Sequence, residues 1–283
     1  MLNVNISGFA DEISQSITEQ FEHLNKLDIK YFEPRGVDGK NISDLTLDEA
    51  KALKSKMDSC GIKASSIGSP IGKIFVTDDF EPQMEKLKKT MEIAKILGTK
   101  YIRIFSFFIP KGEDAGIYRD EVISRMKAMT ALAEGEDVIL LHENEKEIYG
   151  DIASRCLDVL KSVNSPNLRA VFDPANFVQC GEVTYPDAFD MLESYIEYMH
   201  IKDATPDGTV VPAGHGIGNV EAILAKLCRN NYSGFLSLEP HLGSFEGLSA
   251  LELDDEMQRL EKSDASKFTL AYTELKKIID KLN

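Results

Sequence analysis

Four residues of the types that bind divalent metals stand at the ends of four successive apolar segments. These residues are Glu143, Asp173, His200 and Glu239. Three carboxylates brought together would repel one another, and this repulsion would raise their pKa values. A divalent cation removes the repulsion, and three carboxylates with one imidazole suit Mn²⁺, Mg²⁺ or Co²⁺, whereas Zn²⁺ sites more often contain further histidine or cysteine. A single acidic residue at such a position is usually structural or solvated, but four in succession predict a metal site.

Short β-type runs alternate with longer amphipathic segments along the whole chain. We expect strands at 4–8, 31–33, 63–67, 101–105, 138–145, 168–172, 198–201 and 235–238. Apolar residues at helical spacing predict helices at 14–28, 47–60, 81–97, 117–133, 152–163, 185–194, 220–229 and 265–282. Strict alternation implies a parallel sheet with right-handed crossovers, and eight such units within 283 residues favour a closed barrel. The predicted fold is α/β, a single (β/α)8 TIM barrel domain over residues 1–283.

This architecture would bring the four ligands together. In such barrels, the side chains that do chemistry lie at the carboxyl ends of the strands, around one mouth. The first predicted strand is not followed by a GxGxxG motif, so a dinucleotide-binding fold loses its main support. The irregular stretch 243–264 predicts either a surface helix or lid over one barrel end, or a solvated loop. It contains an acidic cluster formed by Glu252, Asp254, Asp255 and Glu256.

Longer motifs surround the four ligands. They are His142-Glu143-Asn144-Glu145, Phe172-Asp173-Pro174-Ala175-Asn176, His200-Ile201-Lys202-Asp203, Leu238-Glu239-Pro240-His241, the early Gly8-Phe9-Ala10-Asp11-Glu12 and the Gly214-His215-Gly216 turn. With these motifs the chain resembles the xylose isomerase-like barrel superfamily, in its sugar isomerase and epimerase branch. The resemblance implies that the four ligands bind one divalent metal, commonly Mn²⁺, and that Glu143 and Glu239 also act as catalytic acid and base. One departure is Asn176, where similar ketose 3-epimerases have a histidine, and His-Ile-Lys-Asp resembles inosose dehydratases.

The expected function is that of a metal-dependent isomerase or epimerase acting on a ketose or related polyol. A divalent ion can act as a Lewis acid on the carbonyl and neighbouring hydroxyl, while one glutamate moves the proton through an enediolate. The same groups could instead expel a β-hydroxyl, which would make the protein a lyase acting on a keto-inositol or keto-sugar. A third alternative, prompted by Asn176, is a metal-binding subunit without turnover. An endonuclease of the same superfamily would need more histidine ligands than five His residues provide, and a basic face.

Five further residues are candidates for substrate contact. They are Glu33, Arg103, Asn176, Lys202 and His215. For Arg103 and Lys202 the alternative is an ion pair with a neighbouring carboxylate, and for Glu33 it is an ion pair with Arg35. His215 lies in the glycine-rich turn 214–218 before a helix, where barrels can bind phosphate, although the scarcity of basic residues favours a flexible connection.

The side chains beside these candidates allow simpler interpretations. Strand alternation turns His142 away from Glu143, which favours packing for this histidine. His241 is a candidate for supporting Glu239 from behind. Three phenylalanines could form a wall for sugar stacking, although core packing is favoured for at least two of them: Phe9, Phe105 and Phe107.

The composition limits the partners. The net charge of −15 argues against a nucleic-acid backbone or an anionic membrane surface, so we expect a small-molecule sugar or polyol as substrate, no nucleic acid and no membrane. The N-terminus has neither a basic region nor an apolar core of the secretory type, and four scattered cysteines favour free thiols, which together predict a cytoplasmic protein. A homo-oligomer is compatible with the sequence.

Overall fold

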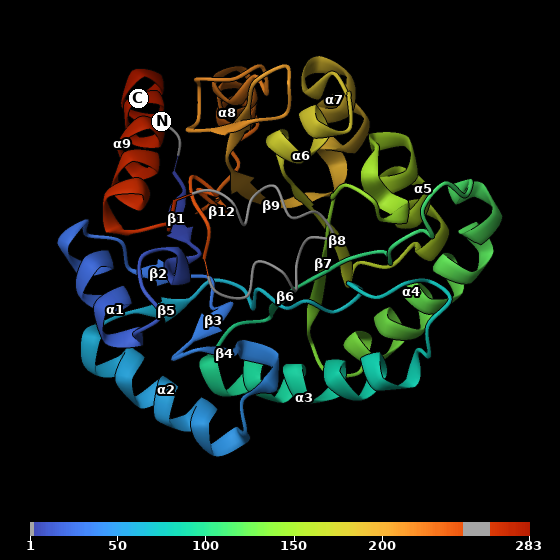
Figure 1. Cartoon of the computed structure of the whole chain (residues 1–283), viewed down its shortest axis with the longest axis horizontal. Coiled ribbons are helices and arrows are strands. Elements are labelled where there is room, and N and C mark those ends of the chain that lie inside the picture. The colour runs from blue at the N-terminus through green and yellow to red at the C-terminus, as the bar shows by residue number, and fades with distance from the viewer. Residues whose placement is uncertain (1–2, 246–260) are drawn as a thin grey trace.

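Parallel strands close into a barrel that is surrounded by helices (Figure 1). The computed structural model describes residues 3–245 and 261–283. One six-stranded sheet runs in the order β1, β12, β9, β8, β7, β6, and β2 and β5 form a parallel pair. The strands are β1 (Asn5–Gly8), β2 (Tyr31–Phe32), β5 (Lys63–Ala64), β6 (Tyr101–Ile104), β7 (Ile139–Glu143), β8 (Leu168–Phe172), β9 (Ile196–Ile201) and β12 (Phe235–Leu238).

Backbone hydrogen bonds at the edges of the short pair complete the ring. The amide of Glu33 donates to the carbonyl of Gly8 at 2.9 Å, which joins β2 to β1. On the other side, the amide of Ile67 donates to Tyr101 and its carbonyl accepts from Arg103, both at 2.9 Å. The two short strands therefore bridge the edges of the six-stranded sheet, and the predicted α/β barrel is confirmed.

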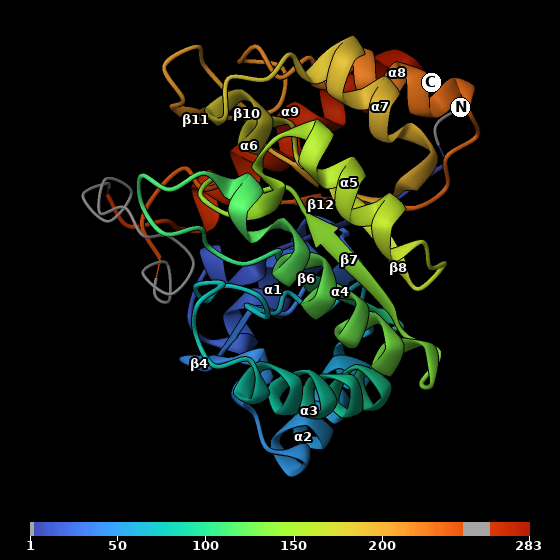
Figure 2. The ribbon, with the colours of Figure 1, turned by 90° about the vertical axis from the view of Figure 1, so that its right-hand side faces the viewer.

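Helices follow the strands and cover the outside of the barrel (Figure 2). They are α1 (Ile17–Lys26), α2 (Leu47–Cys60), α3 (Glu81–Leu97), α4 (Arg119–Glu134), α5 (Ala153–Val163), α6 (Pro174–Gln179), α7 (Phe189–Leu192), α8 (Val220–Arg229) and α9 (Ala265–Leu282). Their ends follow local chemistry: Thr46 and Glu49 form a capping box before α2, and Gly61 ends that helix with φ of 67°. Within the described ranges, no helix has both the length and the apolar character needed to cross a bilayer.

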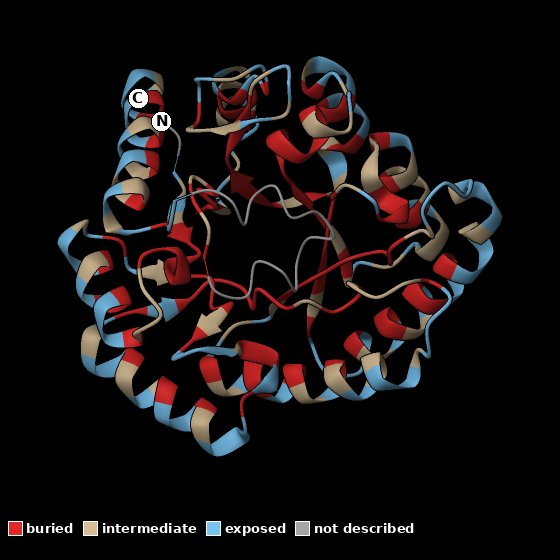
Figure 3. Ribbon diagram, in the orientation of Figure 1, coloured by how far each residue is buried: buried red, intermediate tan, exposed pale blue. Residues whose placement is uncertain are grey.

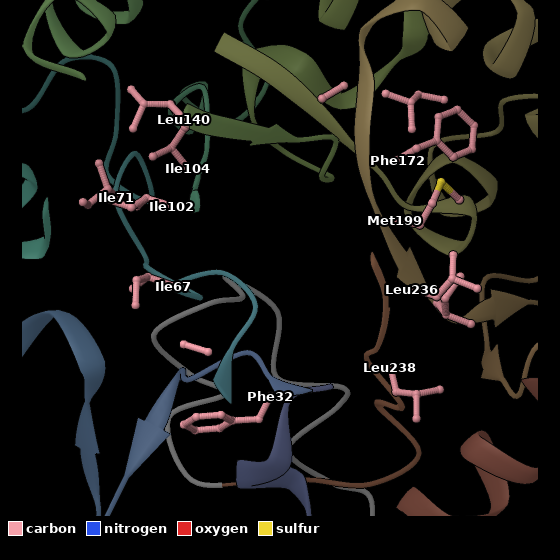
Figure 4. Close-up of a cluster of buried hydrophobic side chains, with 14 of the residues drawn as sticks. Phe32, Ile67, Ile71, Ile102, Ile104, Leu140, Phe172, Met199, Leu236 and Leu238 are labelled. Atoms are coloured by element: carbon pink, nitrogen blue, oxygen red, sulfur yellow. The ribbon is translucent and has the colours of Figure 1, made fainter. Parts of the chain in front are cut away.

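Strand alternation divides the buried side chains into two sets. One set faces the helices and packs with their inner surfaces; Leu140, Phe172 and Leu236 belong to it (Figure 4). The helices accordingly bury the side that faces the barrel and expose the other (Figure 3). The second set forms a separate cluster of Leu141, Val171 and Tyr198, with Tyr101, Ile139 and Phe235 packed against it. Because side chains alternate along a strand, the next inward residues after Leu141 and Tyr198 are Glu143 and His200.

Some predicted elements differ in the structure. The helix expected at 185–194 forms as three consecutive short segments: a π-helical segment at Thr184–Ala188, α7, and a 3-10 turn at Glu193–Tyr195. Tyr185 itself is extended, because the following Pro186 disfavours a helical conformation. The helix α6 was not predicted, although Asp173 and Pro174 form a typical helix start. Two antiparallel pairs were also not predicted: β3 (Gly36–Val37) with β4 (Lys40–Asn41), and β10 (Asp203–Ala204) with β11 (Val210–Val211). Most of the 243–264 stretch, including its acidic cluster, lies outside the described residues.

Candidate metal centre and active site

The four predicted ligands meet at one buried point. Glu143 ends β7, Asp173 follows β8, His200 lies in β9 and Glu239 follows β12. Each offers one ligand atom, and these atoms all lie within 4.8 Å of one another. The four strands are neighbours in one parallel sheet, and the ligands stand at its carboxyl end, where barrels gather functional side chains.

His200 is held from behind so that one ring nitrogen faces the carboxylates. Its Nδ1 lies 2.6 Å from Glu143 Oε1, and its Nε2 lies 3.2 Å from Glu33 Oε2. Glu33 is fully buried, and its Oε2 also accepts hydrogen bonds from Ser237 Oγ at 2.7 Å and the Tyr198 hydroxyl at 3.0 Å. A carboxylate behind a histidine is the usual arrangement that orients a metal-binding imidazole. The structure thus places Glu33 as a support for His200, and the ion pair with Arg35 that we had considered does not form.

The two glutamates divide their oxygens between the ligand cluster and arginines. Glu143 turns Oε1 toward His200, while its Oε2 accepts from Arg103 Nη1 at 3.3 Å. Glu239 turns Oε2 toward His200 Nδ1 at 3.3 Å, and its Oε1 lies 3.3 Å from Arg35 Nη1 and 3.7 Å from Arg103 Nη1. Each glutamate therefore has one oxygen on the ligand side and one fixed by a buried guanidinium.

Lys202 brings a buried ammonium into the same cluster. Its Nζ donates to Glu239 Oε2 at 2.7 Å and lies 3.1 Å from Asp173 Oδ2. Burial alone would raise the pKa of Glu239, but Lys202 and the other nearby cations hold it well below its ordinary value. Burial raises the pKa of Asp173 to about 7, against the opposing effect of Lys202. Asp173 also splits its oxygens, because Oδ1 caps α6 by accepting from the amide of Asn176 at 3.0 Å.

These residues fit a divalent cation. The set has three carboxylates and one imidazole, and no described residue makes a hydrogen bond of good geometry to Asp173 Oδ2. The carboxylates of Glu143, Glu33 and Glu239 outweigh burial and raise the pKa of His200 well above its ordinary value. Because metal ligands must be deprotonated, a cation bound here would compete with the proton on His200.

Arg103, Asn176 and Lys202, which we had predicted to contact substrate, all lie at this cluster. Arg103 is 1% exposed, and its Nε and Nη2 have no hydrogen-bond partner among the described residues. Asn176 Nδ2 donates to the carbonyl of Asn144 at 2.8 Å and lies 3.5 Å from Glu143 Oε1. The alternative of ion pairs with neighbouring carboxylates is also realised for Arg103 and Lys202, and substrate contact by these residues stays a prediction.

His215 is not brought to the cluster. Its side chain is 56% exposed and its Nε2 lies 3.1 Å from Glu274 on α9. The turn that contains it is neither open nor loosely held, because the amides of Gly214, Gly216 and Gly218 donate to the carboxylate of Asp203 at 3.0, 3.1 and 2.7 Å. A substrate contact by His215 stays a prediction without a contact to support it, and the flexibility that we expected for this turn stays a prediction too.

The aromatic candidates separate into two groups. Phe9 lies against the rings and cations of the cluster, with His200 5.1 Å away in an edge-on contact and the Arg103 guanidinium 4.8 Å from its centroid. The ring centroid of Phe105 lies 4.9 Å from the same guanidinium. Phe107 packs in the main core beside Phe80. The predicted packing role of His142 is confirmed: it is 1% exposed, its Nε2 lies 2.9 Å from Ser106 Oγ, and burial lowers its pKa to about 4.

Several site residues escaped the sequence interpretation. Arg35 is 3% exposed and pairs with Asp11, Glu12 and Glu239. Glu145 pairs with Lys73 at 2.9 Å beside the cluster. Burial raises the pKa of Glu12 to about 8, against the opposing charge of Arg35. The available signal was the acidic pair Asp11-Glu12 shortly after the first predicted strand, which places charge at the same mouth as the ligands.

Comparison with known proteins places this site in a family. The family model described as "Xylose isomerase-like TIM barrel" matches residues 21–263. The chain belongs to this family. A curated relative from Bacillus anthracis, 3-dehydroshikimate dehydratase, is 24% identical over 156 residues, which are 52% of this chain and 55% of the relative. The chain thus matches about half the length of that relative.

Two solved structures extend the likeness to nearly the whole chain. A D-tagatose 3-epimerase-like protein is 17% identical and superposes with a TM-score of 0.75, covering 99% of this chain and 98% of the other. The IOLI protein, solved with a bound zinc atom, is also 17% identical, with a TM-score of 0.73 and 99% coverage of both chains. At this identity the structures establish a shared fold.

Proposed function

We propose that the protein is a divalent-metal-dependent isomerase or epimerase acting on a small ketose or related polyol, with Mn²⁺ as the preferred metal and the cytoplasm as its location. The observation that carries this proposal is the pair of glutamates: Glu143 and Glu239 both belong to the ligand cluster, and a separate arginine contact fixes the second oxygen of each. Two carboxylates at one site can serve as a proton acceptor and a proton donor.

The proposed metal ligands are Glu143, Asp173, His200 and Glu239. When bound, a divalent cation supplies Lewis acidity that makes the carbon beside a carbonyl more acidic. Glu33 fixes the ring of His200, and Asn144 holds the backbone on both sides of Asp173, with its amide donating to the Asp173 carbonyl and its oxygen accepting from the Asp173 amide, both at 2.9 Å.

The protein groups would perform the proton transfers. One glutamate takes the proton from the carbon next to the carbonyl, and the other returns a proton to the opposite face for epimerisation, or to the neighbouring position for isomerisation. Arg103 has two buried donor nitrogens without partners among the described residues, which suits a substrate oxygen. Full burial of this cluster excludes water that would otherwise weaken these interactions.

A lyase is the second candidate, and Lys202 is the observation that favours it. Its ammonium is buried and lies 2.7 Å from Glu239, so its positive charge can stabilise the oxygen of a departing hydroxyl group. Asn176 replaces the histidine that the resemblance to epimerases implies at this position, and the curated relative in Bacillus anthracis is named a dehydratase. If a β-hydroxyl is expelled after proton removal, the product is dehydrated.

A solvent-exchange experiment tests the proposal. The Mn²⁺-loaded protein is incubated in D₂O with a panel of ketoses, keto-inositols and keto-sugar acids, and the products are followed by proton NMR and ultraviolet absorbance. An isomerase or epimerase incorporates deuterium beside the carbonyl and forms a product of unchanged formula. A lyase forms an absorbing enone or dione instead. A metal-loaded protein that leaves every member of the panel unexchanged and unchanged would contradict the enzyme proposal and favour a metal-binding subunit without turnover.

A further inference from the structure

A second buried network lies directly behind Glu239 and is centred on Arg35. The guanidinium of Arg35 donates from Nε and Nη2 to the two oxygens of Asp11, at 2.8 and 3.0 Å. Nη2 also donates to Glu12 Oε1 at 3.1 Å. The rings of Phe9 and Phe245 pack close to the same group, with their centroids 4.3 and 4.1 Å from its central carbon. Position and plane of the guanidinium are thus both fixed.

The remaining nitrogen of Arg35 points at the candidate active site. Nη1 donates to Glu239 Oε1 at 3.3 Å and lies 3.4 Å from His241 Nε2. Glu12 reaches the same segment, because its Oε2 accepts from the amide of His241 at 2.8 Å. The residues after β1 therefore hold both the arginine and the backbone that follows Glu239. None of Asp11, Glu12 and Arg35 belongs to the four-ligand cluster.

We infer that Arg35 is a positioning residue for Glu239: it fixes Oε1 of this glutamate, and thereby directs Oε2 toward the other three ligands. This inference rests on the proposed function, since it assigns a purpose to the orientation of a metal ligand and acid–base group. A carboxylate with one oxygen held by a rigid donor keeps the other oxygen in a fixed direction. Residues that hydrogen-bond to metal ligands in this way orient the ligands and change the metal affinity.

Lysine cannot replace arginine in this arrangement. A guanidinium presents several donors in one plane, so it binds both oxygens of Asp11 and still reaches Glu239. An ammonium is a single point charge on a flexible stem. Arg35→Lys therefore keeps the buried positive charge and removes the fixed link between Asp11 and Glu239.

The chain offers a matched control in Arg125. This arginine is 8% exposed, pairs with Glu121 at 2.6 Å, and lies near the rings of Phe80 and Phe107 at 5.0 and 5.4 Å. It thus shares the burial, the carboxylate partner and the two aromatic neighbours of Arg35, but it touches no member of the ligand cluster among the described contacts. Arg125→Lys reports what the same change does to a buried arginine elsewhere.

The test measures Mn²⁺ binding to the full chain by titration calorimetry and the electron paramagnetic resonance spectrum of the bound ion. We expect Arg35→Lys to weaken Mn²⁺ binding by about 10-fold and to change the spectrum, since loss of an outer partner typically weakens metal binding by about 10- to 100-fold. Arg125→Lys should leave both readouts unchanged. Asp11→Asn, which disturbs Arg35 without contacting Glu239, should change them in the same direction and provides a second variant if Arg35→Lys does not fold.

A double-mutant comparison separates positioning from general destabilisation. If Arg35 acts through Glu239, adding Arg35→Lys to Glu239→Gln should weaken Mn²⁺ binding no further than Glu239→Gln does alone. The inference is overturned if the two losses add, or if Arg35→Lys binds Mn²⁺ as the unmodified protein does with an identical spectrum. If the unsubstituted protein binds no Mn²⁺, the proposed function is overturned, and the inference about Arg35 with it. If the unsubstituted protein binds Mn²⁺ and only the variants behave otherwise than expected, the inference about Arg35 alone is overturned.

Discussion

The ligands and the residues that hold them come from two differently built parts of the barrel. The ligands stand on or directly after β7, β8, β9 and β12, which pair in parallel in one continuous sheet, with a register shift between β8 and β9 at Ala170/Val171. Glu33 and Arg35 instead follow β2, a strand of two residues that leaves the sheet early. The segment 33–35 packs tightly against Gly68. A Cβ added to Gly68 would lie 3.2 Å from the Pro34 carbonyl oxygen and 2.6 Å from the Phe9 ring.

The two parts therefore have different roles: the ladder strands place the ligands, and the segment after β2 places the residues that hold them. A regular parallel ladder repeats the same inward direction from strand to strand, so it can aim several ligands at one point. A segment that leaves the ladder can reach sideways, and it places carboxylate and guanidinium groups behind ligands that are already aimed. The comparison predicts that changes on the ladder weaken metal binding more strongly than changes on the short-strand side.

The largest effect is expected from a ligand on the ladder. Asp173→Asn removes a negatively charged ligand, and we expect Mn²⁺ binding to weaken by at least about 100-fold, on the order of 3 kcal/mol. Titration calorimetry measures this change. Asp207→Asn, at an exposed loop carboxylate, is the control and should bind normally. Wild-type affinity in Asp173→Asn would remove the aspartate from the ligand set.

A smaller effect is expected on the short-strand side. Glu33→Gln keeps the shape of the side chain behind His200 but removes the charge that orients the His200 ring. We expect Mn²⁺ binding to weaken by about 10- to 100-fold, as is typical when a residue that hydrogen-bonds to a metal ligand is replaced. Glu197→Gln is the control, because this carboxylate accepts from the Tyr101 hydroxyl at 2.6 Å and contacts no ligand in the described contacts. Equal losses in Glu33→Gln and Asp173→Asn would break the distinction between the two parts of the barrel.

A third substitution separates stability from metal binding. The Asp203 carboxylate is fully buried and accepts from the amides of Ala204 and three glycines. We expect Asp203→Asn to lower the free energy of unfolding by about 3 kcal/mol, because hydrogen bonds to a charged acceptor contribute about 1.5–3 kcal/mol each and are not additive. Urea unfolding of the metal-free protein measures this. A loss of Mn²⁺ affinity larger than the loss in Glu33→Gln would show that this turn also supports the ligands.

The smallest effect is expected at Asn176. Asn176→Ala removes the 2.8 Å hydrogen bond to the Asn144 carbonyl and the long contact to Glu143, which we expect to lower stability by about 1 kcal/mol. Mn²⁺ binding should change by less than a few-fold. Thermal unfolding and calorimetry check both statements, and a loss as large as that of Glu33→Gln would make Asn176 a support of equal weight.

The same division explains how far the sequence predicted the structure. The ladder strands are short, mostly apolar runs, so their positions were readable, and the bounds of β8 and β12 agree with the prediction. The four ligands were readable too, because each follows such a run. The supports were not, since Arg35 and Asp11 are far from Glu239 along the chain and only the closed ring brings them together. Local chemistry also misled: Pro186 lies within a helical apolar pattern, and Tyr185 before it is extended where that pattern begins.

The turn around Asp203 has a consequence for which molecules this barrel can accept. Successive backbone amides that point inward form a nest, which in other proteins captures a phosphate. Here the nest at 214–218 is filled by a carboxylate that the chain itself supplies. The amides of this nest are already paired, so a phosphate group could use them only by displacing the carboxylate of Asp203.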